Sequence, residues 1–187
     1  MSRPAGPAPL LRRILQRGAC AALVSGLLLV RQGRRDACSG AAPLNAISHW
    51  LWPESALRQC GLSARYTLVG AIIHWGASCF WSAIYEGHRQ AGAPPPRARP
   101  PSRRPPAPAS EVPSHDLVNA LALSAIAAWV DLVLVPPRLS PGFERHLSDA
   151  SLCRVYLAFG IGLAWGGARG RRAHRLPPGT RQLHVES

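Results

Sequence analysis

Four apolar stretches, separated by segments rich in arginine and proline, constrain the fold of this chain more than any other feature. The stretch from Leu117 to Pro137 contains a single charged residue, Asp131, and the stretch from Tyr66 to Tyr85 contains no acid and no arginine. A helix needs about 20 mostly apolar residues to cross ~30 Å of hydrocarbon. The pattern therefore predicts an all-α integral membrane bundle of four transmembrane helices.

The predicted spans divide the chain into a membrane domain and flanking polar segments. We expect the transmembrane helical domain at residues 14–168, with spans at about 14–30, 66–85, 117–135 and 151–168. We expect a disordered cytoplasmic N-terminus at 1–13, a disordered loop rich in proline and arginine at 87–114, and a basic cytoplasmic tail at 169–187. Because proline lacks the N–H that helices and sheets require, the loop is predicted to adopt polyproline-II-like conformations.

The first apolar block is the shortest of the four. Only 13 residues lie between Arg17 and Arg31, so this block can span only if the helix extends back through Ile14 and Arg17 snorkels to the interface. A short apolar core after arginines also fits a signal peptide or an interfacial segment, which would leave three spans. The arginines that follow the block, and the lack of an A-x-A cleavage pattern after it, favour the uncleaved span.

The net charge of +13 is carried by arginines that lie beside the apolar stretches. Arginines in this position set membrane orientation and meet anionic lipid headgroups, so we expect the lipid bilayer as the partner and no nucleic acid. Fourteen arginines fall in the N-terminal segment, the central loop and the tail, and seven fall in the other two loops. The positive-inside rule then places both termini in the cytoplasm, although the cluster of Arg31, Arg34 and Arg35 counts against this orientation.

The loop between the first two spans is predicted to hold a short interfacial or re-entrant helix. Its apolar positions at helical spacing are Leu44, Ile47 and Leu51. Asn45, His49 and Trp52 mark the neighbouring face, and the two tryptophans of the segment suit the level of the headgroups. If the loop is periplasmic, Cys38 and Cys60 could form a disulfide, but the sequence alone leaves this pairing open.

Small residues recur at four-residue spacing in all four spans, a pattern that lets helices approach closely in lipid. The small residues are Gly18, Ala22 and Gly26; Gly70, Ser78 and Ser82; Ala120, Ser124 and Ala128; and Ala158, Gly162 and Gly166. These stripes predict a tight bundle, and they could also support a homo-oligomer.

Three ionisable residues extend the stripes and are predicted to point into the bundle. At 1.5 Å per residue, Asp131 lies about 7 Å, Arg154 about 5 Å and His74 about 12 Å inside the ends of their spans. An unpaired carboxylate at such depth costs several kcal/mol, so we hypothesise that Asp131 pairs with Arg154 between the third and fourth helices. The alternative is that Asp131 and His74 exchange protons or hold a cation, as such residues do in small transporters.

A second polar group gathers at the predicted cytoplasmic end, where Glu86 and His88 end the second span and His115 and Asp116 begin the third. Carboxylates and imidazoles can bind a divalent metal. Polar residues at helix ends near a membrane interface are the simpler interpretation, so we predict no metal site and no cofactor. P-loop, GxSxG and HExxH motifs are missing, which predicts a protein without enzymatic activity.

The segments NAISHWLWPESA, YTLVGAIIHWGASCFWSAIYEG and DLVLVPPRLSPGFERHLS resemble an uncharacterised family of small proteobacterial multi-pass inner-membrane proteins. The resemblance covers most of residues 43–165. It implies a location in the bacterial inner (plasma) membrane and implies no activity. We therefore predict a structural or accessory membrane protein of unknown biochemical activity. The alternative is a small transporter, or a proton- or metal-responsive component, that uses His74, Asp131, Glu86 and His115.

Overall fold

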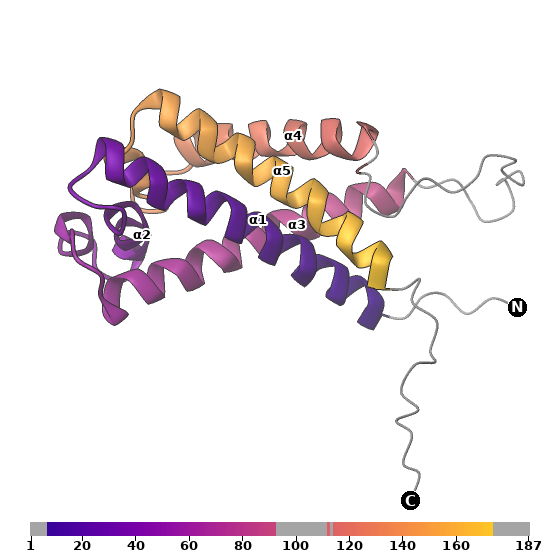
Figure 1. The fold of residues 1–187 in the computed structure, drawn as a ribbon, viewed down its shortest axis with the longest axis horizontal. Helices are drawn as coiled ribbons and strands as arrows, with labels where there is room; N and C mark the ends of the chain where they lie inside the picture. The colour runs from indigo at the N-terminus through magenta and orange to yellow at the C-terminus, as the bar shows by residue number, and fades with distance from the viewer. Residues whose placement is uncertain (1–6, 93–111, 113, 174–187) are drawn as a thin grey trace, which may run out of the picture.

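The computed structural model of the chain describes residues 7–92, 112 and 114–173. This part of the chain is helical and contains no strand. Its four long helices are α1 (Pro7–Asp36), α3 (Val69–Ala91), α4 (Ser114–Trp129) and α5 (Asp149–Ala173), and they run along the long axis of the molecule (Figure 1). The start of α1 and the end of α5 lie at the same end (Figure 1). The shorter elements are α2 (Ala42–Ile47), the 3-10 turns η1 (Ser48–Trp50), η2 (Ala56–Arg58) and η6 (Phe143–Arg145), and the π-helical turns η3 (Ala64–Leu68) and η5 (Val130–Leu134).

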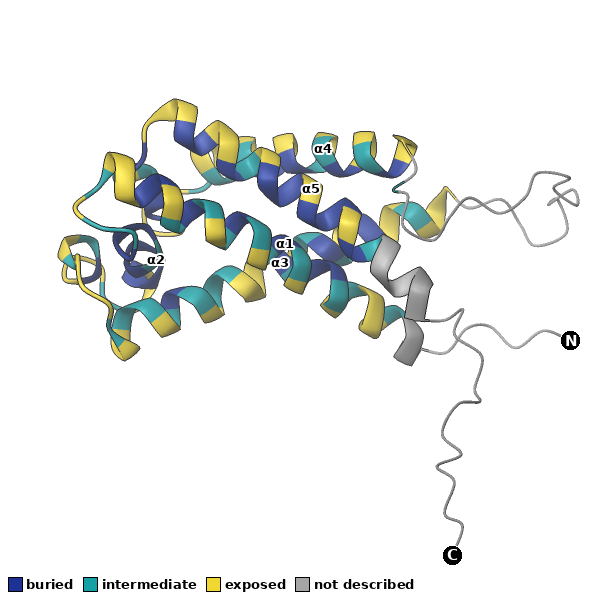
Figure 2. Ribbon diagram, viewed as in Figure 1, coloured by how far each residue is buried: buried dark blue, intermediate teal, exposed yellow. Residues whose placement is uncertain are grey.

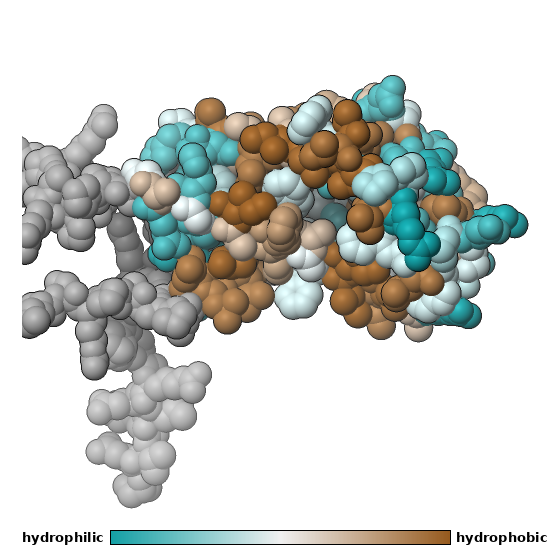
Figure 3. Space-filling model, turned by 180° about the vertical axis from the view of Figure 1, so that it is seen from behind, coloured by the Kyte–Doolittle hydropathy of each residue, from teal (hydrophilic) through white to brown (hydrophobic). Residues whose placement is uncertain are grey.

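Within the described residues, four helical segments are long and apolar enough to cross a membrane. They are Leu10–Asp36, Ala64–Ala91, Ser114–Leu134 and Asp149–Gly167, and they match the four predicted spans. Large apolar side chains such as Leu27, Ile72 and Val118 are exposed, whereas polar side chains such as Ser25 and Ser82 are buried. Figures 2 and 3 show the exposed outer faces and their apolar character. Water-soluble proteins seldom expose so much apolar surface, and helices in lipid do so as a rule.

All four long helices extend beyond at least one predicted boundary, and α4 does so by beginning at Ser114. The helix α1 begins at Pro7, a favourable first position for proline, so residues 7–13 of the segment predicted as disordered are helical. The helix α3 continues to Ala91, and α5 continues to Ala173. Apart from Gly92, Val112 and Ser114, the rest of the predicted N-terminal segment, of the proline-rich loop and of the tail lies outside the described residues.

Small residues bring the long helices into close contact, as the stripes predicted. A Cβ atom at Gly18 of α1 would lie 2.8 Å from the Cα of Cys79 in α3. A Cβ at Gly162 of α5 would lie 2.8 Å from the Cα of Ala21 in α1. The helix α1 therefore lies against both α3 and α5, α4 lies against α5, and α3 and α4 touch only slightly. Because these glycines are used inside the chain, an oligomer would have to use other surfaces.

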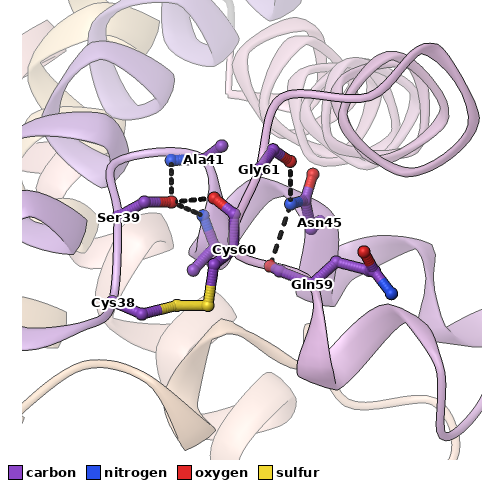
Figure 4. Close-up of a disulfide and its surroundings, with 8 residues drawn as sticks. Cys38, Ser39, Ala41, Asn45, Gln59, Cys60 and Gly61 are labelled. Carbon is purple, nitrogen blue, oxygen red and sulfur yellow. Dashed lines mark hydrogen bonds between the residues drawn. A yellow bond between two sulfur atoms is a disulfide. The ribbon is translucent and has the colours of Figure 1, made fainter.

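The segment between α1 and α3 closes one end of the bundle. A disulfide joins Cys38 to Cys60, and the hydroxyl of Ser39 donates a hydrogen bond to the carbonyl of Cys60 (Figure 4). The amide of Asn45 donates to the carbonyls of Gln59 and Gly61, at 2.9 Å each (Figure 4). The pairing that the sequence left open is thus present, and it fixes the ends of this segment relative to each other.

The predicted short helix is present as α2, but its position differs from the prediction. Asn45 and His49 are buried rather than interfacial, and α2 as a whole is buried beneath the surrounding segments (Figure 2). The Nδ1 atom of His49 lies 2.9 Å from the carbonyl oxygen of Ala46. Gly142 has a φ of +85° and packs against the same carbonyl, where a Cβ would come within 2.6 Å. The helix α2 (Ala42–Ile47) lies in the loop between α1 and α3 and is held against the loop that precedes α5. We call this helix the plug, because it closes one end of the bundle.

Candidate functional site

A cavity of about 550 Å³ lies between α3 and α4, where the two helices splay apart. Its lining comes from α1, α3, α4 and α5 and from the plug at one end of the bundle. Gly76, Ala77 and Phe80 line the cavity and are also exposed, so the cavity opens on the outer surface of the bundle. The rear view in Figure 3 looks onto this face, where apolar side chains surround a hollow. Ligand cavities in proteins typically have volumes of ~300–1,000 Å³.

Asp131 lines the cavity and does not form the predicted ion pair. Its Oδ2 accepts a hydrogen bond of 3.0 Å from the hydroxyl of Tyr156 on α5. The side chain of Arg154 is exposed instead, so the hypothesis of an Asp131–Arg154 clamp is wrong. Two features of helix geometry explain the error. Asp131 lies in the π-helical turn η5, which changes the rotation per residue. In an α-helix each four-residue step also turns the stripe by about 40°, so Arg154 is rotated by about 120° from Gly166.

His74 lines the same cavity from α3. Its Nε2 lies 2.9 Å from the hydroxyl of Ser25 on α1, and that hydroxyl also donates to the carbonyl of Ala21 at 2.7 Å. Since the serine gives its proton to the carbonyl, its oxygen is left to accept a proton from the imidazole. His74 and Asp131 therefore face one cavity, each tied to a neutral hydroxyl of a neighbouring helix.

A buried ion-pair network lies at the other end of the bundle, which holds the start of α1 and the end of α3. Nε of Arg17 is 2.6 Å from Oε1 of Glu86, and Nη2 of Arg17 is 3.9 Å from Oδ2 of Asp116. Arg89 contacts the same two carboxylates, at 3.3 Å and 3.2 Å. The ring of Tyr85 lies 4.9 Å from the Arg17 guanidinium, and its hydroxyl donates to the backbone carbonyl of Asp116. Nε of Arg13 on α1 also lies 3.5 Å from Oε2 of Glu86. Three arginines thus meet two carboxylates, and the five residues come from three helices.

The fourth helix joins this network through its backbone. Nη1 of Arg17 donates a 2.9 Å hydrogen bond to the carbonyl of Leu163 on α5. A Cβ at Gly167 would collide with the Arg17 guanidinium. Arg17 is only 1% exposed, so the prediction that it snorkels to the interface is wrong. It instead lies at the junction of all four long helices, because the two carboxylates offset the cost of burying its charge.

The ion-pair network includes only some of the polar residues that were predicted at the cytoplasmic interface. Glu86 and Asp116 are buried in it, whereas His88 and His115 are exposed. The described residues hold no group of three or more His, Cys, Asp or Glu side chains placed to bind a metal. Sequence reasoning missed the contribution of Arg17, although a signal was available. One arginine in an apolar block and two acids at the ends of other spans, all predicted on one side of the membrane, would have suggested that these charges pair.

The described chain is thus an all-helical bundle with four helices of membrane-spanning length, a cavity with one carboxylate at its wall, and a buried ion-pair network at one end. Comparison with protein-family models, with curated protein sequences and with solved structures found no match.

Proposed function

We propose that this chain is a multi-pass protein of a bacterial inner membrane, with both termini in the cytoplasm. The disulfide between Cys38 and Cys60 supports this orientation, because disulfides persist in oxidising compartments such as the periplasm. The start of α1 and the end of α5 lie at the end of the bundle away from it, next to the most arginine-rich segments. Arginine-rich segments remain on the cytoplasmic side.

Within that membrane, the protein acts without catalysis as an accessory protein that holds a lipophilic small molecule taken from the bilayer. The cavity between α3 and α4 is the observation that carries this proposal. In a bilayer its opening would face acyl chains, so a molecule dissolved in the membrane could enter without crossing water. The ion-pair network holds the other end of the bundle closed, which allows α3 and α4 to remain apart near the plug.

Binding of a neutral aromatic probe to the purified full-length chain tests this function. Pyrene should bind saturably in detergent micelles, and Gly76→Phe should remove the binding by filling the cavity. A Cβ at Gly76 meets no atom within 4 Å, so the larger side chain has room to enter without distorting the helix. Gly87→Phe is the matched control, because Gly87 lies on the same helix with equally open surroundings and away from the cavity.

The expected result is loss of saturable pyrene binding in Gly76→Phe and unchanged binding in Gly87→Phe. Both variants should keep the helical circular dichroism and the disulfide of the wild-type chain. Saturable binding that survives Gly76→Phe, or a wild-type chain that binds neither this probe nor a charged lipophilic one, contradicts the proposed function.

A small transporter is the second candidate function, and the shared cavity of His74 and Asp131 favours it. Both residues could take part in moving a proton together with a bound molecule. Flux assays in liposomes with His74→Ala and Asp131→Asn distinguish the two functions. A transporter loses flux while the variants remain folded, and a passive binding protein has no flux to lose.

A further inference from the structure

We infer that the cavity between α3 and α4 selects a lipophilic organic monocation, with Asp131 as its counter-ion. This inference rests on the proposed function and adds the charge class of the ligand. Among the described residues that line the cavity, Asp131 is the only one with a formal charge at neutral pH. The arginines that give the chain its net charge of +13 are not part of the described lining. The cavity therefore has the opposite sign of charge from the protein as a whole.

The rest of the lining suits a cation as well as a hydrophobic body. Aromatic rings attract cations through their electron-rich faces, and they do so more strongly when water is excluded. The aromatic residues of the cavity are Trp50, Phe80, Trp81, Phe143, Tyr156 and Phe159. The other lining residues are mostly aliphatic or small, including Ile73, Val130 and Val155. An ion whose charge is surrounded by apolar groups matches this combination. A small hydrated ion would have to give up its water to enter, and the mainly apolar wall offers little to replace that water.

Tyr156 holds the carboxylate in place. Its hydroxyl donates to Oδ2 of Asp131 from the neighbouring helix α5, which restrains the side chain at the cavity wall. An anionic ligand would meet the carboxylate with repulsion, and a neutral ligand would gain nothing from it. Asp131 thus acts as the group that discriminates by charge, while the surrounding rings and aliphatic side chains set the size of the ligand.

The test compares two ions of nearly the same size and shape and opposite charge, tetraphenylphosphonium and tetraphenylborate. Each is titrated against pyrene bound to the full-length chain in micelles of an uncharged detergent, and the ratio of the two displacement midpoints is measured. The same ratio is measured for Asp131→Asn, which keeps the shape of the side chain and an oxygen to accept the bond from Tyr156. Any intrinsic difference in how the ions enter micelles is common to both proteins and cancels.

The ratio of the tetraphenylborate midpoint to the tetraphenylphosphonium midpoint should be at least about tenfold larger in the wild-type chain than in Asp131→Asn. A change of this size is expected for loss of a nearby opposite charge in a mainly apolar site. Both midpoints are measured against pyrene on the same protein, so any change in pyrene affinity caused by the substitution cancels in their ratio. Asp149→Asn is the matched control, because it removes an exposed carboxylate outside this cavity, and it should retain the wild-type ratio.

The outcomes separate the two proposals. Equal ratios in the wild-type chain and Asp131→Asn overturn the inference about charge while leaving a neutral binding site intact. If pyrene does not bind, radiolabelled tetraphenylphosphonium is titrated directly, and the lack of saturable binding overturns both proposals. Direct binding that Gly76→Phe abolishes and Asp131→Asn weakens supports the cation site without a neutral probe.

Discussion

Replacement of Arg17 by methionine should destabilise the chain more than any other single loss of a surface or interface arginine. The substitution keeps a long side chain and removes the charge that contacts Glu86, Asp116 and the carbonyl of Leu163. Removing one partner from a buried ion pair costs about 3–5 kcal/mol, since the remaining charge stays buried. Arg89 still contacts both carboxylates, so we expect a value near the low end, about 3 kcal/mol.

The measurement is reversible unfolding of the purified chain in mixed micelles with increasing dodecyl sulfate, followed by circular dichroism. Arg12→Met is the matched control, because Arg12 is an exposed arginine on the same helix and should change the free energy of unfolding by less than about 0.5 kcal/mol. In a double-mutant cycle with Glu86→Gln, the two losses should overlap by at least about 1 kcal/mol. An effect of Arg17→Met no larger than that of Arg12→Met, or strictly additive losses in the cycle, would refute the buried network.

Three further predictions concern the plug and the helix contacts. Loss of the disulfide in a Cys38→Ser and Cys60→Ser double variant should cost about 3 kcal/mol in the same unfolding assay, given the 22-residue separation; an unchanged midpoint would show that the bond contributes nothing. Asn45→Ala leaves two backbone carbonyls without their donors and should cost about 2 kcal/mol, with faster hydrogen exchange confined to the loop; uniform exchange along the chain would contradict this. Gly162→Leu places a side chain against the α1 backbone near Ala21 and should cost at least about 2 kcal/mol, whereas wild-type stability would argue against close packing of α1 and α5.

The helices were predictable because apolar length is a local property of the sequence. Each span extends over consecutive residues, so the positions of α3, α4 and α5 follow from reading the chain once. The close approach of Gly18 and Gly162 to neighbouring helices also followed from a local pattern, the four-residue recurrence of small side chains.

The partners of the charged residues were not predictable in the same way. Extending a stripe by counting residues assumes that the helix turns by the same angle at every residue. The π-helical turn that contains Asp131 turns by a different angle, so the assumption fails there. Arg17 meets carboxylates from helices that begin far along the chain, and no local feature of its apolar block reveals them. The plug around Asn45 depends on contacts with the last loop and with α3, which only the assembled structure contains.

The central position of α1 affects how the protein is made. During synthesis this helix emerges before the other three long helices, yet the side chains that neutralise its buried guanidinium belong to α3 and α4, and the helix it packs against most extensively, α5, follows both. In the proposed membrane location, the cation must remain in contact with water or lipid phosphate near the surface of the bilayer until α3 and α4 have been inserted. The depth of α1 in that membrane would therefore be settled only after α3 and α4 have joined it.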